Sequence, residues 1–344
     1  MGSSTFIVAE ISANHGKDIN IVKKSIKKAK EIGCNAVKIQ TYRPDTITLD
    51  CDNEYFRLDT GTIWDGQTLY DLYSDAYLPW EWHKELFEYA ENENIVLFST
   101  PFDFSSVDLL EKCNNPIYKI ASFEIMDIPL IEYAASKGKP MIISAGIATE
   151  NEIVEAIDAC RRQGNNDITI LKCTSQYPAK LEDANLVMIN DMKKRFDVKV
   201  GLSDHTEGDI AAIVAVAMGA EVIEKHFIID KNIGGPDSSF SMVPDDFKNM
   251  ILHIRKAEKT LGEIDYNLSE KQIKSRKYSR SLFVVEDVKK GDRITDQNVK
   301  SIRPEGGLKP KYYKTVAGRY FNRDVKRGIP LTADMISDII DDIK

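Results

Sequence analysis

Two histidines in this sequence are spaced so that they could bind a single metal ion. His205 and His226 each come shortly after an apolar segment, and the two segments follow one another along the chain. If the segments are neighbouring parallel strands, their ends lie about 5 Å apart, so the two imidazoles can share one ion. Two protein ligands leave positions open for water and substrate, as a Lewis-acid centre requires. Imidazole ligands suit Mn²⁺, Co²⁺, Zn²⁺ or Fe²⁺ and do not choose among them.

Carboxylates, lysines and hydroxyls end the other apolar segments. Glu10 ends the first segment and Asp237 follows the last, so both would lie beside the histidines if the strands form a closed ring. Lys38 and Lys119 lie in two further segments. The serines that follow other segments are Ser122, Ser144 and Ser203. A single strand lysine is usually a paired structural charge, whereas several that converge with hydroxyls indicate a phosphate or carboxylate site.

The elements that would position these residues alternate between short apolar runs and longer helical segments. The predicted strands are residues 6–9, 36–39, 95–98, 117–120, 140–143, 168–171, 198–202 and 222–223. Helical segments fill the gaps, for example at 19–32, 150–162 and 210–218. About eight strand–helix units over roughly 260 residues are typical of a closed (β/α)₈ TIM barrel, whose chemistry lies at the carboxyl ends of the strands.

A doubly wound open sheet is the alternative arrangement of the same units. However, no Gly-x-Gly-x-x-Gly follows the first predicted strand, which disfavours the dinucleotide-binding form of that fold. We therefore predict an α/β protein in which a TIM barrel is followed by a small second domain.

The predicted domains are the barrel at residues 1–267, a polar linker at 268–280 and the small domain at 281–344. The segments that begin at Asp287 and Asp324 share the pattern D-V-K-[KR]-G-x-x-[IL]-T. This repeat predicts two similar β-turns in a domain of mostly short strands.

Composition excludes several classes of partner. The net charge of −8 makes a nucleic-acid partner unexpected, because such proteins usually carry a basic face. The sequence has no apolar stretch of about 20 residues and no signal-peptide pattern, so we expect a cytoplasmic protein without a membrane partner. The 5 cysteines form no C-x-x-C pair and are odd in number, as expected for reduced thiols.

Taken together, the motifs resemble the sialic acid synthase family. They are, in order, A-E-I-S-A-N-H at 9–15, K-I-Q-T at 38–41, S-T-P-F at 99–102, G-L-S-D-H-T at 201–206, E-K-H-F at 224–227 and G-P-D at 235–237. The resemblance runs through nearly the whole chain. From about residue 280 the sequence is similar to the antifreeze-like (SAF) domain that these synthases carry.

The resemblance implies a metal-dependent transferase that forms a carbon–carbon bond. Phosphoenolpyruvate would condense with the open-chain aldehyde of an N-acetylated amino-sugar, water would add at C2 of phosphoenolpyruvate, and phosphate would leave by C–O cleavage. Mn²⁺ is the expected ion, with Mg²⁺ or Co²⁺ as alternatives. A domain-swapped homodimer is also implied, in which the small domain of one subunit covers the barrel mouth of the other.

The resemblance further implies a role for each site residue. His205 and His226 would hold the metal, and Glu10 and Asp237 would join them as catalytic residues. The implied phosphoenolpyruvate-binding residues are Lys38, Thr100, Lys119, Ser122, Ser144, Ser175 and Ser203. The implied sugar-binding residues are Gln40, Tyr177, Asp237 and Arg303, the last acting in the partner's site.

Some positions separate this chain from the members of the family that form N-acetylneuraminate. Ser175 stands where those enzymes have Asn, and Ser238 where they usually have His. Residues 62–73 and 79–83, which are rich in aromatics, look like the branch that makes pseudaminic acid from 2,4-diacetamido-2,4,6-trideoxy-L-altrose. Such aromatics either present apolar surface to a 6-deoxy sugar or only pack their loop.

Three other functions fit part of the pattern. The same condensation on N-acetylmannosamine or a legionaminate precursor would give an N-acetylneuraminate or legionaminate synthase. A Schiff-base aldolase would use Lys38 or Lys119 as its nucleophile. A glycan-binding module on a non-catalytic barrel would have no physical need for the histidines and lysines at the strand ends.

Overall fold

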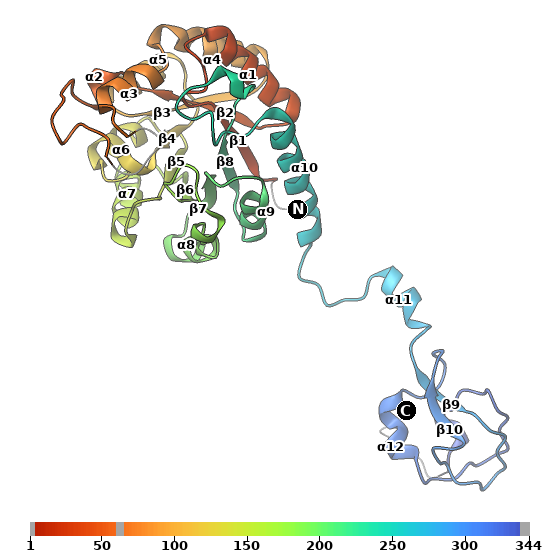
Figure 1. The fold of residues 1–344 in the computed structure, drawn as a ribbon. Coiled ribbons are helices and arrows are strands. Elements are labelled where there is room, and N and C mark those ends of the chain that lie inside the picture. Colours follow the sequence, from red (N-terminus) through yellow and green to blue (C-terminus); the bar gives the residue numbers. More distant parts are fainter. Residues whose placement is uncertain (1–3, 60–64, 338–344) are drawn as a thin grey trace. The chain divides into compact units, whose positions relative to one another are not determined.

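The computed structural model describes residues 4–59 and 65–337. Eight parallel strands form a closed barrel, which confirms the predicted fold class (Figure 1). The strands are β1 (Phe6–Glu10), β2 (Ala36–Thr41), β3 (Val96–Pro101), β4 (Tyr118–Ile120), β5 (Met141–Ser144), β6 (Ile168–Cys173), β7 (Lys199–Asp204) and β8 (Val222–His226). Pairing of β1 with β8 closes the ring and places Glu10 opposite His226, while β2 places Lys38 on the other side of Glu10.

Helices surround the barrel on its outside (Figure 1). They are α1 (Ile19–Ile32), α2 (Pro44–Ile47), α3 (Leu69–Ala76), α4 (His83–Asn92), α5 (Phe104–Lys112), α6 (Ile128–Ala135), α7 (Glu150–Arg162), α8 (Met188–Phe196), α9 (Ile210–Ala217) and α10 (Pro244–Leu261). Sequence signals set several ends: Asp18 caps the first amide groups of α1, and Gly33 ends it with φ 99°. Among the described residues, no helix is long and apolar enough to cross a membrane.

Every second residue of each strand points into the barrel, so the inward-pointing side chains form two layers. The lower layer is apolar and buried, and consists of Val8, Ala36, Phe98, Ile142, Leu171 and Val222. Two residues further along the same strands stand polar side chains: Glu10, Lys38, Thr100, Ser144, Cys173 and Glu224. Because alternate residues share a face of the strand, these groups lie directly above the apolar layer, at the carboxyl ends.

The chain divides into two compact units, residues 1–262 and 263–344. The second unit contains α11 (Glu270–Arg276), the antiparallel strands β9 (Ser281–Val284) and β10 (Val299–Ile302), and the short helix α12 (Tyr313–Val316). It has its own apolar core, which includes Leu282, Ile294 and Phe321. The range 268–280, predicted as a linker, contains α11, and every residue from 261 to 280 is exposed.

The two copies of the sequence repeat pair with each other in the second unit. Val288 and Val325 exchange backbone hydrogen bonds of 2.9 and 3.0 Å. Asp287 accepts from Lys326 Nζ at 2.7 Å, and Asp324 accepts from Lys289 Nζ at 2.9 Å. Each copy also contains a glycine with positive φ, as the predicted turns require.

Candidate active site

The predicted site residues of the barrel gather at the carboxyl ends of its strands. Those less than a tenth exposed are Glu10, Lys38, Thr100, Lys119, Ser122, Ser144, Ser203, His205 and Asp237. Gln40, Ser175, Tyr177 and His226 are partly buried. Arg303 belongs to the second unit, where it directly follows β10 and is exposed.

Two lysines and two carboxylates form a buried cluster at the centre of the site. Lys38 Nζ lies 2.8 Å from Glu10 Oε2 and donates to Thr100 Oγ1 at 3.1 Å. Glu224 Oε1 lies 3.7 Å from Lys38 Nζ and 3.5 Å from Lys119 Nζ. Both lysines are therefore held in fixed positions by carboxylates. Glu224 was not predicted as a site residue, although it lies two residues before His226 and so shares its face of β8.

Burial and neighbouring charges shift the pKa values of the two carboxylates of this cluster in opposite directions. Burial raises the pKa of Glu10 to about 7 against the nearby Lys38 charge, and the Glu224 carboxylate adds to the rise. Burial would also raise the pKa of Glu224, but Lys119 and Lys38 hold it below its usual range. Glu224 is thus the carboxylate that stays charged, and Glu10 is the one that takes up a proton near neutral pH.

A group of hydroxyls lies beside the lysines at the ends of β4, β5 and β6. Ser122 Oγ accepts a hydrogen bond from the Gly146 amide at 3.1 Å. A Cβ on Gly146 would lie 2.2 Å from Ser175 Oγ and 2.8 Å from Ser122 Oγ, so a side chain at this position would displace these hydroxyls. The buried Ser144 Oγ has no hydrogen-bond partner within the part of the chain that the structure describes. Such a hydroxyl is available to an oxyanion ligand.

The two predicted metal ligands stand side by side. The ring centroids of His205 and His226 are 5.3 Å apart. His205 Nδ1 lies 3.1 Å from the Thr174 carbonyl oxygen, so Nε2 is the ring atom that could bind an ion. Burial and the nearby positive groups, led by His205, lower the pKa of His226 well below its ordinary value, so this ring is neutral, as a metal ligand must be.

The histidine pair fits a divalent ion with open coordination positions. His226 Nδ1 is buried with no hydrogen-bond partner in the described structure, and Asp237 Oδ2 lies 3.8 Å away from it. The Ala13 amide donates to the same carboxylate at 3.3 Å and so fixes its position. No group of three or more His, Cys, Asp or Glu side chains among residues 4–59 and 65–337 has metal-binding geometry.

Three further residues belong to the site by geometry but were not predicted. Cys173 Sγ lies 3.8 Å from His205 Nδ1, and this contact lowers the pKa of the thiol to about 7, although burial would raise it. Glu124 ends the 3₁₀ helix that begins at Ser122, and burial raises its pKa to about 7 against the charge of the nearby Lys119. The Phe240 ring lies 5.1 Å from the His226 ring and 5.4 Å from the Tyr177 ring. Only Cys173 could have been found from the sequence. It lies two residues after the apolar Leu171 in the same strand, and alternate residues of a strand point to the same side.

Two aromatics of the segments resembling the pseudaminic acid branch, Tyr73 and Trp80, contact Tyr42. Tyr42, at the end of β2, lies 5.6 Å from the Tyr73 ring and 5.1 Å from the Phe102 ring. Trp80 Nε1 donates to the Tyr42 carbonyl oxygen at 3.0 Å. These contacts give Tyr73 and Trp80 a packing role, while residues 62–64 of the segment lie outside the described residues.

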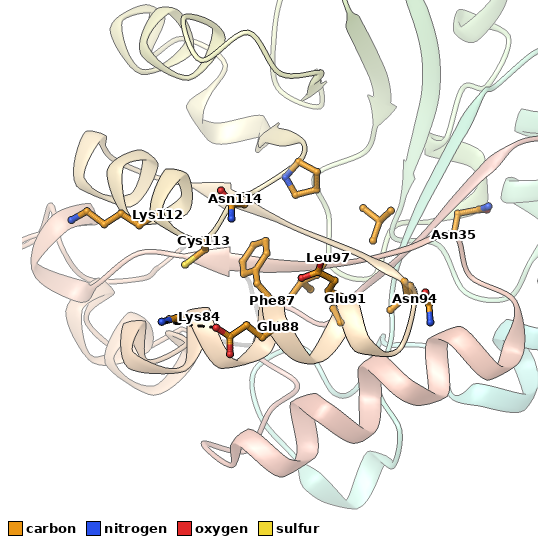
Figure 2. Close-up of a pocket in the computed structure, with 14 residues that line it drawn as sticks. Asn35, Lys84, Phe87, Glu88, Glu91, Asn94, Leu97, Lys112, Cys113 and Asn114 are labelled. Atoms are coloured by element: carbon orange, nitrogen blue, oxygen red, sulfur yellow. Dashed lines mark ion pairs between the residues drawn. The ribbon is translucent and has the colours of Figure 1, made fainter.

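A cavity of about 610 Å³ lies away from this site (Figure 2). It is lined by residues before or at the start of strands, including Asn35, Val96 and Pro116. Figure 2 shows Lys84 and Glu88 on its wall as an exposed ion pair. The cavity contains none of the predicted site residues and lies at the amino ends of the strands.

Comparisons with known proteins identify the family to which the chain belongs. The NeuB family matches residues 25–266 and the SAF domain matches residues 279–337, so the chain belongs to the NeuB family. Pseudaminic acid synthase of Helicobacter pylori is 47% identical over 96% of this chain and 97% of its own length. An N,N'-diacetyllegionaminic acid synthase of Campylobacter jejuni is 35% identical over 94% of this chain and 97% of its own length.

A solved structure agrees in fold. The N-acetylneuraminic acid synthetase of Leptospira borgpetersenii is 30% identical and superposes with a TM-score of 0.70, covering 79% of this chain and 90% of its own. The resemblance to the sialic acid synthase family is thereby confirmed.

Proposed function

We propose that the chain is a pseudaminic acid synthase, which condenses phosphoenolpyruvate with 2,4-diacetamido-2,4,6-trideoxy-L-altrose to give pseudaminic acid and phosphate. The observation that carries this proposal is its 46–47% identity to pseudaminic acid synthases of Helicobacter pylori and Campylobacter jejuni, against 35% for the legionaminic relatives. The buried lysine and hydroxyl groups support the phosphoenolpyruvate half of the reaction.

Phosphoenolpyruvate would bind through charges and donors that are already in place. Lys38 and Lys119, with Thr100 and Ser203, lie around the central carboxylates. The hydroxyls of Ser122, Ser144 and Ser175 would bind the other end of the ligand. Because these donors are preorganised by burial, they need little rearrangement when negative charge develops on the leaving phosphate.

His205 and His226 would hold a divalent ion, with Mn²⁺ expected and Mg²⁺ or Co²⁺ as alternatives. When bound, such an ion supplies a Lewis acid that polarises the sugar aldehyde. Asp237 would accept hydrogen bonds from sugar hydroxyls. Glu10 would transfer a proton during the addition of water, because a pKa of about 7 lets it hold or release a proton at neutral pH.

Gln40 and Tyr177 would contact the sugar on this barrel, and Arg303 would reach the sugar of a partner subunit. Gln40 Nε2 donates to Glu10 Oε1 at 3.3 Å, which keeps its amide at the edge of the site. We further propose a domain-swapped homodimer in the cytoplasm, in which Arg303 completes the neighbouring site.

The test is phosphate release from phosphoenolpyruvate by the full chain with Mn²⁺, offering the trideoxy-altrose and N-acetylmannosamine separately. We expect release with the altrose sugar alone, and loss of release after chelation with EDTA. His226→Ala should abolish it, whereas His253→Ala, at an exposed histidine of α10, should not. Release with N-acetylmannosamine alone would refute the pseudaminic assignment, and inactivation by borohydride with substrate would indicate a Schiff base instead.

A further inference from the structure

A buried ion pair lies directly behind the two histidines. Asp204 and Lys225 precede His205 and His226, and they are register partners on β7 and β8. Lys225 Nζ lies 2.7 Å from Asp204 Oδ2, and the two side chains are 3% and 1% exposed. Because side chains alternate along a strand, the pair faces away from the barrel interior, into which Glu224 and the two histidines point.

The same pair also fixes the turn that follows β7. Asp204 Oδ1 accepts from the Thr206 amide at 2.9 Å and from its hydroxyl at 2.8 Å. Lys225 Nζ donates to the Thr206 carbonyl oxygen at 2.5 Å. The residues on both sides of His205 are therefore bound to the residue that precedes His226.

Apolar residues would have been the ordinary choice at these positions. Other residues on the outer faces of the same strands are apolar and buried, such as Val200, Leu202 and Ile223. Burying a charged pair in place of apolar side chains contributes little or nothing to stability, because both charges lose their hydration. A fixed geometry is what such a hydrogen-bonded pair supplies and an apolar pair does not.

We infer that Asp204 and Lys225 are positioning residues that hold His205 and His226 at the separation a shared metal ion requires. This inference rests on the proposed function only in taking the two histidines as metal ligands. Neither residue touches the ion or the substrate. They act by tying the two strand ends, and the turn after β7, into one rigid unit.

The test is the Mn²⁺ affinity of the full chain without substrates, measured by electron paramagnetic resonance titration of free Mn²⁺. Asp204→Asn combined with Lys225→Met removes both charges together, so no lone buried charge threatens folding. We expect this double variant to bind Mn²⁺ about 10- to 100-fold more weakly, the range known for residues that support metal ligands.

A matched control is Lys193→Met combined with Glu221→Gln, which removes an exposed ion pair of 2.8 Å near the start of β8. It should leave the affinity unchanged. Unchanged affinity in the Asp204/Lys225 double variant, with only a lower unfolding midpoint, would overturn the inference. If that variant does not fold, Lys225→Arg, which keeps the charge but not the compact ammonium geometry, must weaken Mn²⁺ binding or the inference fails. Absence of Mn²⁺ binding by the unaltered protein would instead reject the metal site itself.

Discussion

Gly146→Ala adds only a methyl group, but we expect it to weaken phosphoenolpyruvate binding strongly. The backbone of Gly146 is not in the left-handed region, so alanine fits the main chain. The added methyl group, however, would lie 2.2 Å from Ser175 Oγ, 2.8 Å from Ser122 Oγ and 3.1 Å from Cys173 Sγ. Carbon cannot approach these atoms so closely, so the hydroxyls must turn away or the loop must move.

The size of the effect follows from the hydrogen bonds that would be lost. A hydrogen bond to a charged ligand contributes about 1.5–3 kcal/mol. Since about 1.4 kcal/mol corresponds to a factor of ten, displacing one serine hydroxyl should raise the KM for phosphoenolpyruvate about 10- to 100-fold. The KM for the sugar should change less, because Gln40 lies on β2 and Asp237 follows β8.

The assay is initial-rate phosphate release, with each substrate varied in turn. Ile147→Ala, at the exposed neighbouring side chain, is the matched control and should behave like the unaltered protein. In a Ser175→Gly background the methyl group has more room, so adding Gly146→Ala should cost less than it does alone. An unchanged KM for phosphoenolpyruvate in a folded Gly146→Ala variant would refute the assignment of this hydroxyl group to the anion site.

Three more predictions test other parts of the molecule. Burial lowers the pKa of His83 from 6.5 to about 4 in the folded protein. Between pH 6.5 and pH 4 this histidine is therefore protonated in the unfolded chain but neutral in the folded one, so the protein loses stability as the pH falls through this range. His83 alone should make the protein about 2 kcal/mol less stable at pH 5 than at pH 7, so His83→Gln should shift the pH 5 to pH 7 difference measured by urea unfolding by that amount. Phe240→Ala should raise the KM for the sugar about tenfold and leave the KM for phosphoenolpyruvate unchanged. A higher KM for phosphoenolpyruvate with an unchanged KM for the sugar would show that this ring does not contact the sugar. Mixing Arg303→Ala subunits with His226→Ala subunits should restore part of the activity, and no recovery would count against a swapped dimer.

The barrel and most of its polar layer were predictable because both depend on local periodicity. Alternation of apolar runs and helical segments indicated eight units. Glu10 and Ser144 end two of these strands, and Lys38 lies within a third. The same period of two would have pointed to Cys173 and Glu224, which share a strand face with residues that were recognised.

The remaining features depend on contacts between loops, which periodicity does not describe. Phe240 lies on a turn whose direction is set by packing, and its neighbour Tyr177 is distant in the sequence. The need for glycine at position 146 arises from hydroxyls on two other loops. Such requirements become visible only when the strand ends are placed around one ring.

The carboxylates among the lysines explain how an anion site can be built in a buried barrel mouth. Two lysines without partners would lose hydration, and their pKa values would fall until the charge disappeared. Glu224 opposes this fall, since it lies 3.7 Å from Lys38 Nζ and 3.5 Å from Lys119 Nζ and stays ionised. Glu10 and Glu224 together raise the pKa of Lys38 against the effect of burial, whereas burial still leaves the pKa of Lys119 below its usual range. When an anionic substrate enters, the added negative charge must raise the pKa of Glu10 further, so binding near pH 7 should draw a proton onto that carboxyl. The site would then acquire its general acid in the same step in which it acquires its substrate.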